Sequence, residues 1–75
     1  MKTNDIVYGV HAVTEALIAN TGNKLYIQED LRGKNVEKIK ELATEKKVSI
    51  SWTSKKSLSE MTEGAVHKGF VLRVS

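Results

Sequence analysis

Two glycine-containing segments hold the side chains best suited to binding chemistry. Residues 64–69 read GAVHKG, so His67 and Lys68 stand between Gly64 and Gly69, and a run of β-branched and aromatic residues follows. Glycines let the backbone turn tightly and approach a partner closely, so the pattern predicts a loop that opens a buried strand. Because loops often carry binding residues, His67 and Lys68 are candidate ligand contacts, with a merely solvated loop as the alternative.

The second segment, residues 7–17, reads VYGVHAVTEAL and places His11 where a helix is predicted to begin. An imidazole beside the free N–H groups of a helix N-terminus suits a phosphate or a ribose hydroxyl, and hydrogen bonding to nearby backbone groups is the alternative. Gly9 is explained by a backbone conformation open to glycine. Glu15 follows His11 at the i to i+4 spacing, which predicts a side-chain pair on the helix or an orienting role towards His11 or Lys68.

Two further basic clusters fall between a predicted strand and the helix that follows it. They are Arg32 with Lys34 and Lys55 with Lys56. Since ligands of open α/β sheets gather outside the carboxyl ends of the strands, we expect both clusters at one end of the sheet. The lysines of the central predicted helix are interleaved with glutamates, which is typical of a solvated helix face, and they are Lys38, Lys40, Lys46 and Lys47.

The periodicity of the apolar residues predicts helices and strands in alternation. The clearest helix has an apolar stripe of Val36, Ile39, Leu42 and Ala43, whereas Val48–Thr53 alternates with the period of a strand. The predicted helices cover residues 11–20, 35–47 and 54–61, with a capping box at Ser57–Glu60, and the predicted strands cover residues 24–28, 48–53 and 69–74. Crossovers of this length favour parallel neighbouring strands, so the expected fold is a small three-layer-like α/β sandwich.

The composition is that of one small domain. The chain has 75 residues, a formal net charge of +3 and no cysteine, which leaves no disulfide or thiolate metal site and fits a cytoplasmic location. No apolar run approaches the roughly 20 residues that span a bilayer, so no membrane partner is expected. The charge permits a nucleic-acid partner. No HExxH, Gly-x-Ser-x-Gly, Walker or GxGxxG pattern occurs, which argues against a metal site and against independent catalysis.

Together, residues 7–17 and 64–69 resemble the signature of the SpoU family, also called TrmH, of RNA 2′-O-ribose methyltransferases. The resemblance is to the N-terminal substrate-binding domain of the large-subunit ribosomal RNA guanosine methyltransferases. It implies an RNA substrate-binding domain over residues 6–75, with the fold of certain ribosomal and kink-turn-binding proteins. Residues 1–5 are polar, and we expect a flexible N-terminus there. Lys68 departs from the pattern, because the family usually carries glutamine there and a donor-only cation replaces an amide that also accepts.

The resemblance also implies where the chemistry lies. In the family a knotted C-terminal domain holds S-adenosylmethionine, so this chain is expected to be non-catalytic and to bind no cofactor. The implied partner is structured RNA, in particular large-subunit ribosomal RNA, with a monomeric isolated domain and a homodimeric parent enzyme. Together with the basic clusters, the candidate RNA contacts are His11, Arg32, Lys34, Lys55, Lys56, His67 and Lys68, supported by the loop glycines Gly9, Gly64 and Gly69 and oriented by Glu15.

Two other functions fit the sequence. A structural or protein-docking domain of the same enzyme would use its glycine loops for folding alone. A free-standing small enzyme is the third function, and a gene that continues beyond Ser75 into an S-adenosylmethionine-binding domain would argue against it. RNA binding that weakens steeply with salt would favour the first function, because neutralised phosphates release counterions.

Overall fold

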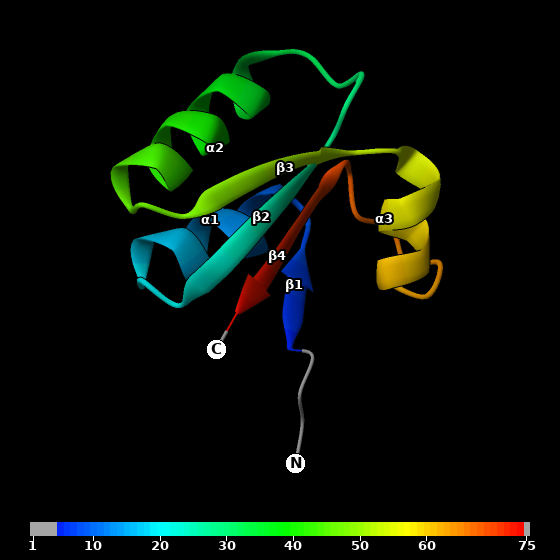
Figure 1. The fold of residues 1–75 in the computed structure, drawn as a ribbon, viewed down its shortest axis with the longest axis horizontal. Helices are drawn as coiled ribbons and strands as arrows, with labels where there is room; N and C mark the ends of the chain where they lie inside the picture. The colour runs from blue at the N-terminus through cyan, green and yellow to red at the C-terminus, as the bar shows by residue number, and fades with distance from the viewer. Residues whose placement is uncertain (1–4, 75) are drawn as a thin grey trace.

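The computed structural model describes residues 5–74, which form a mixed α/β fold (Figure 1). The predicted alternation of helices and strands is confirmed, and only β1 has no counterpart in the sequence pattern, because a strand of 3 residues is too short to show a period. The predicted flexible N-terminus lies outside the described residues except for Asp5. The elements are β1 (Ile6–Tyr8), α1 (Val10–Ile18), β2 (Gly22–Gln28), α2 (Lys34–Glu45), β3 (Ser49–Thr53), α3 (Lys55–Met61) and β4 (Phe70–Val74).

The strands form one sheet in the order β1-β4-β2-β3. The expected parallel pairing holds for β2 and β3, but β4 is antiparallel to both of its neighbours, β1 and β2. The physical reason is the route of residues 62–69, which return the chain to the end of the sheet where α3 begins. Phe70 therefore pairs with Ile27 near the carboxyl end of β2, and β4 runs back from there.

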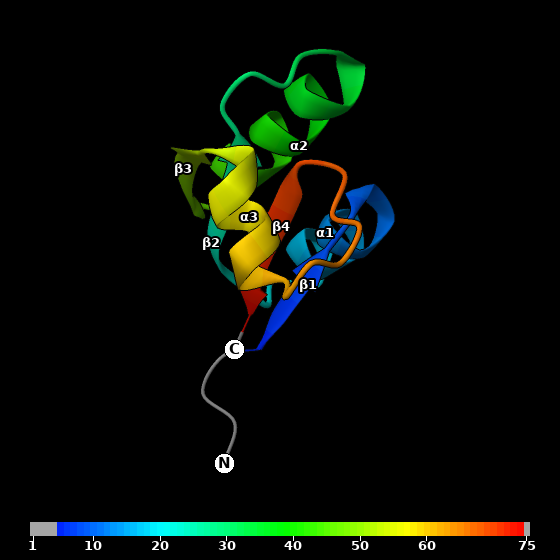
Figure 2. The same cartoon turned by 90° about the vertical axis from the view of Figure 1, so that its right-hand side faces the viewer.

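Helices cover both faces of the sheet, as the predicted sandwich requires. On one face, α1 and α2 pack on strand residues such as Leu25 and Leu72 in a single apolar cluster. Val71 points to the opposite face because successive strand residues alternate. Val71 and Leu58 of α3 are both fully buried but lie outside that cluster. Figure 2 shows α1 and α2 together on one side, with α3 apart from them.

All three helices end in the same way, with a non-glycine residue in the left-handed conformation just after the C-cap. These residues are Asn20, Lys47 and Glu63, with φ of 62°, 60° and 56°. At α2, the N–H of Val48 donates to the C=O of Ala43 at 2.8 Å, the bond of a Schellman motif. The sequence predicts a helix to residue 47, but this turn ends α2 at Glu45. Within residues 5–74 no helix is long and apolar enough to cross a membrane.

The N-terminus of α3 differs from the predicted capping box at Ser57–Glu60. The cap is Ser54, whose hydroxyl oxygen accepts a hydrogen bond from the N–H of Ser57 at 3.2 Å. Ser54 is extended, with φ −71° and ψ 155°, because it directly follows β3, and the helix starts at the next residue. An N-cap must stand outside the helix it caps, which Ser57 does not.

Candidate functional site

The loops that carry most of the predicted site residues meet at one end of the sheet. Strands β1, β2 and β3 run in the same direction and β4 runs opposite, so three carboxyl ends and the start of β4 share this end. Backbone bonds join them: Gly9 N–H to Phe70 C=O at 3.1 Å, and Gln28 N–H to Gly69 C=O at 2.9 Å. The expectation that both basic clusters lie at one end of the sheet is therefore met.

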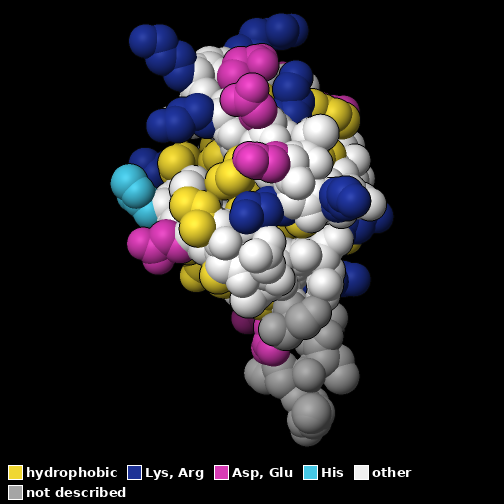
Figure 3. All heavy atoms as spheres, turned by 90° about the vertical axis from the view of Figure 1, so that its left-hand side faces the viewer, with side chains coloured by type: hydrophobic (Ala, Val, Ile, Leu, Met, Phe, Trp, Pro, Cys, Tyr) yellow, Lys and Arg dark blue, Asp and Glu magenta, His cyan; other side chains and the backbone are white. Residues whose placement is uncertain are grey.

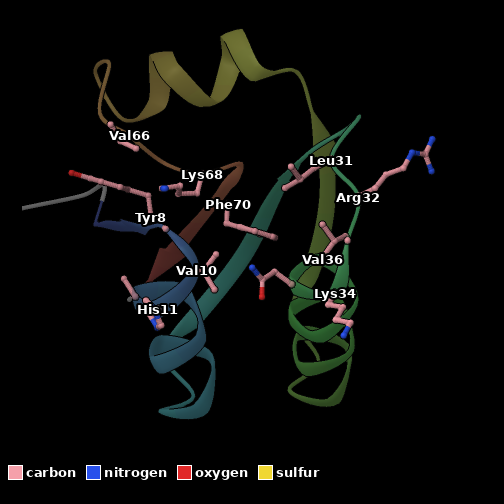
Figure 4. Close-up of a pocket in the computed structure, with 14 residues that line it drawn as sticks. Tyr8, Val10, His11, Leu31, Arg32, Lys34, Val36, Val66, Lys68 and Phe70 are labelled. Atoms are coloured by element: carbon pink, nitrogen blue, oxygen red, sulfur yellow. The ribbon is translucent and has the colours of Figure 1, made fainter.

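A cavity of about 1020 Å³ opens at this end of the sheet (Figure 4). Three segments line it: residues 8–12 at the start of α1, residues 31–36 at the start of α2, and the segment from Val66 to Phe70. The cavity thus lies where the two histidine-containing segments of the sequence meet the loop that follows β2.

The charge of the cavity is of one sign. Four of the predicted contacts line it, and all four are exposed: His11, Arg32, Lys34 and Lys68. Among residues 5–74, no aspartate or glutamate lines this cavity. In Figure 4, Arg32 extends outward from its loop, whereas His11, Lys34 and Lys68 stand around the opening. An anion would meet cationic side chains from two segments, Arg32 with Lys34 and Lys68, and the imidazole of His11 from a third, with no carboxylate among the lining residues to repel it.

Two helix N-termini open onto the same cavity. The N-cap residues are Gly9 of α1 and Gly33 of α2, and neither helix has a side-chain cap. Their φ angles of 92° and 131° are values that glycine tolerates and other residues rarely adopt. The first-turn residues of both helices line the cavity, and the first N–H groups of a helix have no intrahelical partner. Such N–H groups are well placed to donate to phosphate oxygens.

The sequence patterns did not single out several lining residues, because a lone aromatic, aliphatic or amide side chain carries no charge and forms no motif. Val66 is 76% exposed and Tyr8 is 40% exposed, so both offer apolar or aromatic surface at the rim. Asn35 supplies an amide beside Lys34. The signal that could have found them is their place in the chain: Tyr8 is next to Gly9, Val66 is inside the glycine-bracketed loop, and Asn35 follows Lys34.

Lys55 and Lys56 share the end of the sheet but do not line the cavity. They are exposed residues in the first turn of α3, the helix apart from α1 and α2. A ligand would need to extend beyond the cavity to meet them.

Glu15 lies one turn after His11 on α1 and is exposed. Across residues 5–74, no hydrogen bond or ion pair connects Glu15 with His11 or Lys68. Glu15 instead lines a groove between α1 and α2, together with Glu41 and Glu45. Figure 3 shows the side of the molecule where these helices end, with hydrophobic side chains exposed among acidic and basic ones.

His67 lies beneath its loop. Its side chain is 5% exposed, and Nδ1 accepts a hydrogen bond from the N–H of Gly69 at 2.9 Å. Nε2 lies 3.3 Å from the hydroxyl oxygen of Ser59 on α3. The sequence pattern predicts that the loop presents both His67 and Lys68. In the structure Lys68 is exposed and lines the cavity, whereas His67 is buried and does not.

The glycines of the same segment have different structural roles. Gly64 has φ 85° and its N–H donates to Ser59 C=O at 2.8 Å, which completes the turn that ends α3. Gly69 also has φ 85°, and a Cβ at that position would come 2.5 Å from Cδ2 of Leu31. Gly69 is therefore required both by its conformation and by its close approach to the loop after β2.

Comparison with known proteins agrees with the resemblance in sequence. Residues 6–75 match the family described as RNA 2′-O ribose methyltransferase substrate binding. The 23S rRNA (guanosine-2′-O-)-methyltransferase RlmB of Shewanella oneidensis is 38% identical over 77 residues, which cover 99% of this chain and 31% of that protein. RlmB of Photobacterium profundum is 31% identical over 75 residues, covering 96% of this chain and 30% of that protein. The chain thus spans about a third of the length of these relatives.

Proposed function

Since the chain belongs to the SpoU/TrmH family, as a substrate-binding domain of RNA 2′-O-ribose methyltransferases, we propose that it binds structured RNA at the cavity. The RNA is a segment of large-subunit ribosomal RNA, the substrate class named for both relatives. The reaction of the parent enzyme is transfer of a methyl group to a ribose 2′-hydroxyl.

One observation carries this proposal: basic side chains from three segments surround a cavity without carboxylates. Lys34 and Lys68 stand on different sides of the opening and would each neutralise a phosphate. His11 can donate to a phosphate or exchange hydrogen bonds with a ribose hydroxyl. The N–H groups at the two helix N-termini add donors for the same backbone oxygens.

The contribution to catalysis is positioning. Binding of the RNA away from the reacting ribose holds its 2′-hydroxyl near a methyl donor bound elsewhere in the enzyme, which lowers the entropic part of the barrier. The residues that line this cavity do not fit S-adenosylmethionine itself, because its sulfonium is cationic and would meet lysines and an arginine with no carboxylate nearby. We therefore assign the methyl donor to the part of the enzyme outside this chain.

The RNA footprint extends beyond the cavity. Lys55 and Lys56 lie at the same end of the sheet, in the first turn of α3, so a hairpin or internal loop that crosses this end would reach them with its backbone. Their contact is with phosphates and carries no base information.

A protein-docking role is the second candidate, and one observation favours it. Ile18 of α1 is 58% exposed and lines the groove between α1 and α2, which has acidic residues at its margin. An exposed apolar side chain of this kind is typical of a surface that another protein covers.

The test is a titration of the isotope-labelled domain with a large-subunit ribosomal RNA hairpin, followed by amide NMR at two salt concentrations. We expect shifts at residues 8–12, 31–36 and 66–70, and an affinity that falls as salt rises because phosphate counterions are released. Absence of shifts at low salt would reject RNA binding at the cavity and favour docking. Shifts confined to another surface, such as the α1–α2 groove, would also reject the cavity as the RNA site.

A further inference from the structure

We propose that His67 is a positioning residue of the RNA site: its buried imidazole holds the turn that presents Lys68 to the cavity. The inference rests on the proposed function for the ligand of Lys68. It concerns a side chain that cannot itself reach RNA without leaving its place under the loop, since only 5% of it is exposed.

The hydrogen bonds of His67 determine its tautomer. A backbone N–H can only donate, so Nδ1, at 2.9 Å from the nitrogen of Gly69, must be the unprotonated acceptor. A neutral imidazole with a free Nδ1 carries its proton on Nε2. That proton points to the hydroxyl oxygen of Ser59 at 3.3 Å, which accepts it. The ring thus bridges the loop to α3.

The turn that follows His67 has a conformation unfavourable for lysine. Lys68 and Gly69 both have positive φ, 56° and 85°, and the N–H of Phe70 donates to the C=O of His67 at 3.0 Å. These are the features of a type I′ turn, which favours glycine, asparagine or aspartate at its central positions. A lysine in this conformation has an unfavourable backbone energy, which other contacts of the turn must offset. The bond from Gly69 N–H to the imidazole is such a contact.

The other end of the turn is already fixed. The C=O of Gly69 accepts from the N–H of Gln28 at 2.9 Å, and Leu31 leaves no room for a side chain at Gly69. On the side of His67, backbone bonds hold the chain as far as Ala65, whose N–H donates to Thr62 C=O at 3.2 Å, so the imidazole holds the residues between Ala65 and Gly69. With the imidazole in place, Lys68 projects at the cavity rim on the side of Tyr8 (Figure 4). Loss of the Nδ1 acceptor should release Lys68 from this position.

Three substitutions distinguish the contribution of the Nδ1 hydrogen bond from that of the Nε2 hydrogen bond. His67→Asn keeps an acceptor at the place of Nδ1, because its Oδ1 is bonded to Cγ as Nδ1 is. His67→Gln moves its amide one bond further and leaves Gly69 N–H without that acceptor. Ser59→Ala removes only the partner of Nε2. Thermal unfolding of each variant verifies that the comparison is made between folded proteins.

The RNA affinities should divide these variants. We expect His67→Gln to weaken binding of the ribosomal RNA hairpin about fivefold, the same loss as for Lys68→Ala, because each variant loses the contact that Lys68 makes with the RNA. The RNA affinities of His67→Asn and Ser59→Ala should lie within about twofold of that of the unaltered domain, because both variants keep an acceptor for the N–H of Gly69. The double variant with His67→Gln and Lys68→Ala should bind RNA no more weakly than Lys68→Ala alone, because the two substitutions remove the same interaction. Additive losses, or equal losses in His67→Asn and His67→Gln, would overturn the positioning role.

A second measurement does not depend on RNA. Long-range ¹⁵N–¹H correlation of the labelled domain should find the Nε2–H tautomer of His67, and chemical shifts should report loss of the left-handed conformation of Lys68 in His67→Gln only. An Nδ1–H tautomer, or an unchanged turn in that variant, would overturn the inference. If the tautomer and turn behave as expected but the unaltered domain binds no RNA, the proposed function fails and His67 still positions Lys68.

Discussion

The N–H of Gly9 donates to the C=O of Phe70 at 3.1 Å, which joins the start of α1 to the start of β4. The bond brings together two segments that lie near opposite ends of the chain, one carrying His11 and the other Lys68. Both side chains line the same cavity as a result. A change in either segment should therefore alter binding at one site.

The first prediction concerns the lysines of the cavity. Lys34→Ala and Lys68→Ala should each weaken binding of a large-subunit ribosomal RNA hairpin about fivefold, the effect of losing roughly 1 kcal/mol. Each should also lower the slope of log affinity against log salt by about 0.7 to 0.9, because one phosphate contact is lost. Fluorescence anisotropy at several salt concentrations measures both quantities.

The matched control for these variants is Lys24→Ala. Lys24 is exposed near the start of β2, away from the cavity, with its ammonium 5.4 Å from the ring centre of Tyr26. Lys24→Ala removes the same charge as Lys68→Ala. An equal loss of RNA affinity in the two variants would therefore mean that net charge, and not the cavity, governs binding.

The second prediction compares two glycines with the same backbone angle. Gly64 and Gly69 both have φ 85°, but a Cβ at Gly64 meets no atom within 4 Å, whereas at Gly69 it meets Leu31. Gly64→Ala should therefore cost about 1 kcal/mol from the left-handed conformation alone. Gly69→Ala should cost about 1 kcal/mol more, because Leu31 must move out of its packing. Urea unfolding gives both values, and equal costs would show that Leu31 yields freely.

The third prediction is a stabilised variant. Lys47 has φ 60° after the last turn of α2, a conformation that costs a non-glycine residue roughly 1 to 2 kcal/mol. Glycine avoids this cost but loses about 0.4 to 1 kcal/mol through the greater entropy of its unfolded chain. Lys47→Gly should therefore stabilise the domain by about 0.5 to 1 kcal/mol, which raises the melting temperature by about 4 to 8 °C per kcal/mol.

The control for that variant is its neighbour. Lys46 has φ −87°, so Lys46→Gly gains no relief from strain and should be neutral or destabilising. Equal stabilisation by both substitutions would point to the loss of charge and reject the conformational explanation.

The fourth prediction tests the cap of α3. Ser54→Ala removes the acceptor for the N–H of Ser57 and should cost about 1 kcal/mol in calorimetric unfolding. Ser49→Ala is the comparison, because Ser49 is an exposed strand residue at the other end of β3. A negligible cost for Ser54→Ala would mean that α3 does not depend on this cap.

Local sequence patterns were sufficient for most of the secondary structure. The apolar stripe of α2 places Val36, Ile39 and Ala43 in the core, and each is buried. The glutamates of that helix are exposed as the pattern indicates, since a period of 3.6 residues separates a buried face from a solvated one. The resemblance to the family likewise rested on two short segments, and both line the cavity.

Local patterns could not provide the direction of the last strand or the burial of the loop histidine. Strand direction depends on where the chain returns after α3, so the antiparallel β4 followed from the route of residues 62–69 and not from crossover length. The burial of His67 is the clearest example of a feature that local sequence did not predict. As a sequence, a histidine and a lysine between two glycines predict two equivalent contacts. Only the packing of the loop on α3 turned one ring inward, because Gly69 N–H and Ser59 were there to satisfy its two nitrogens.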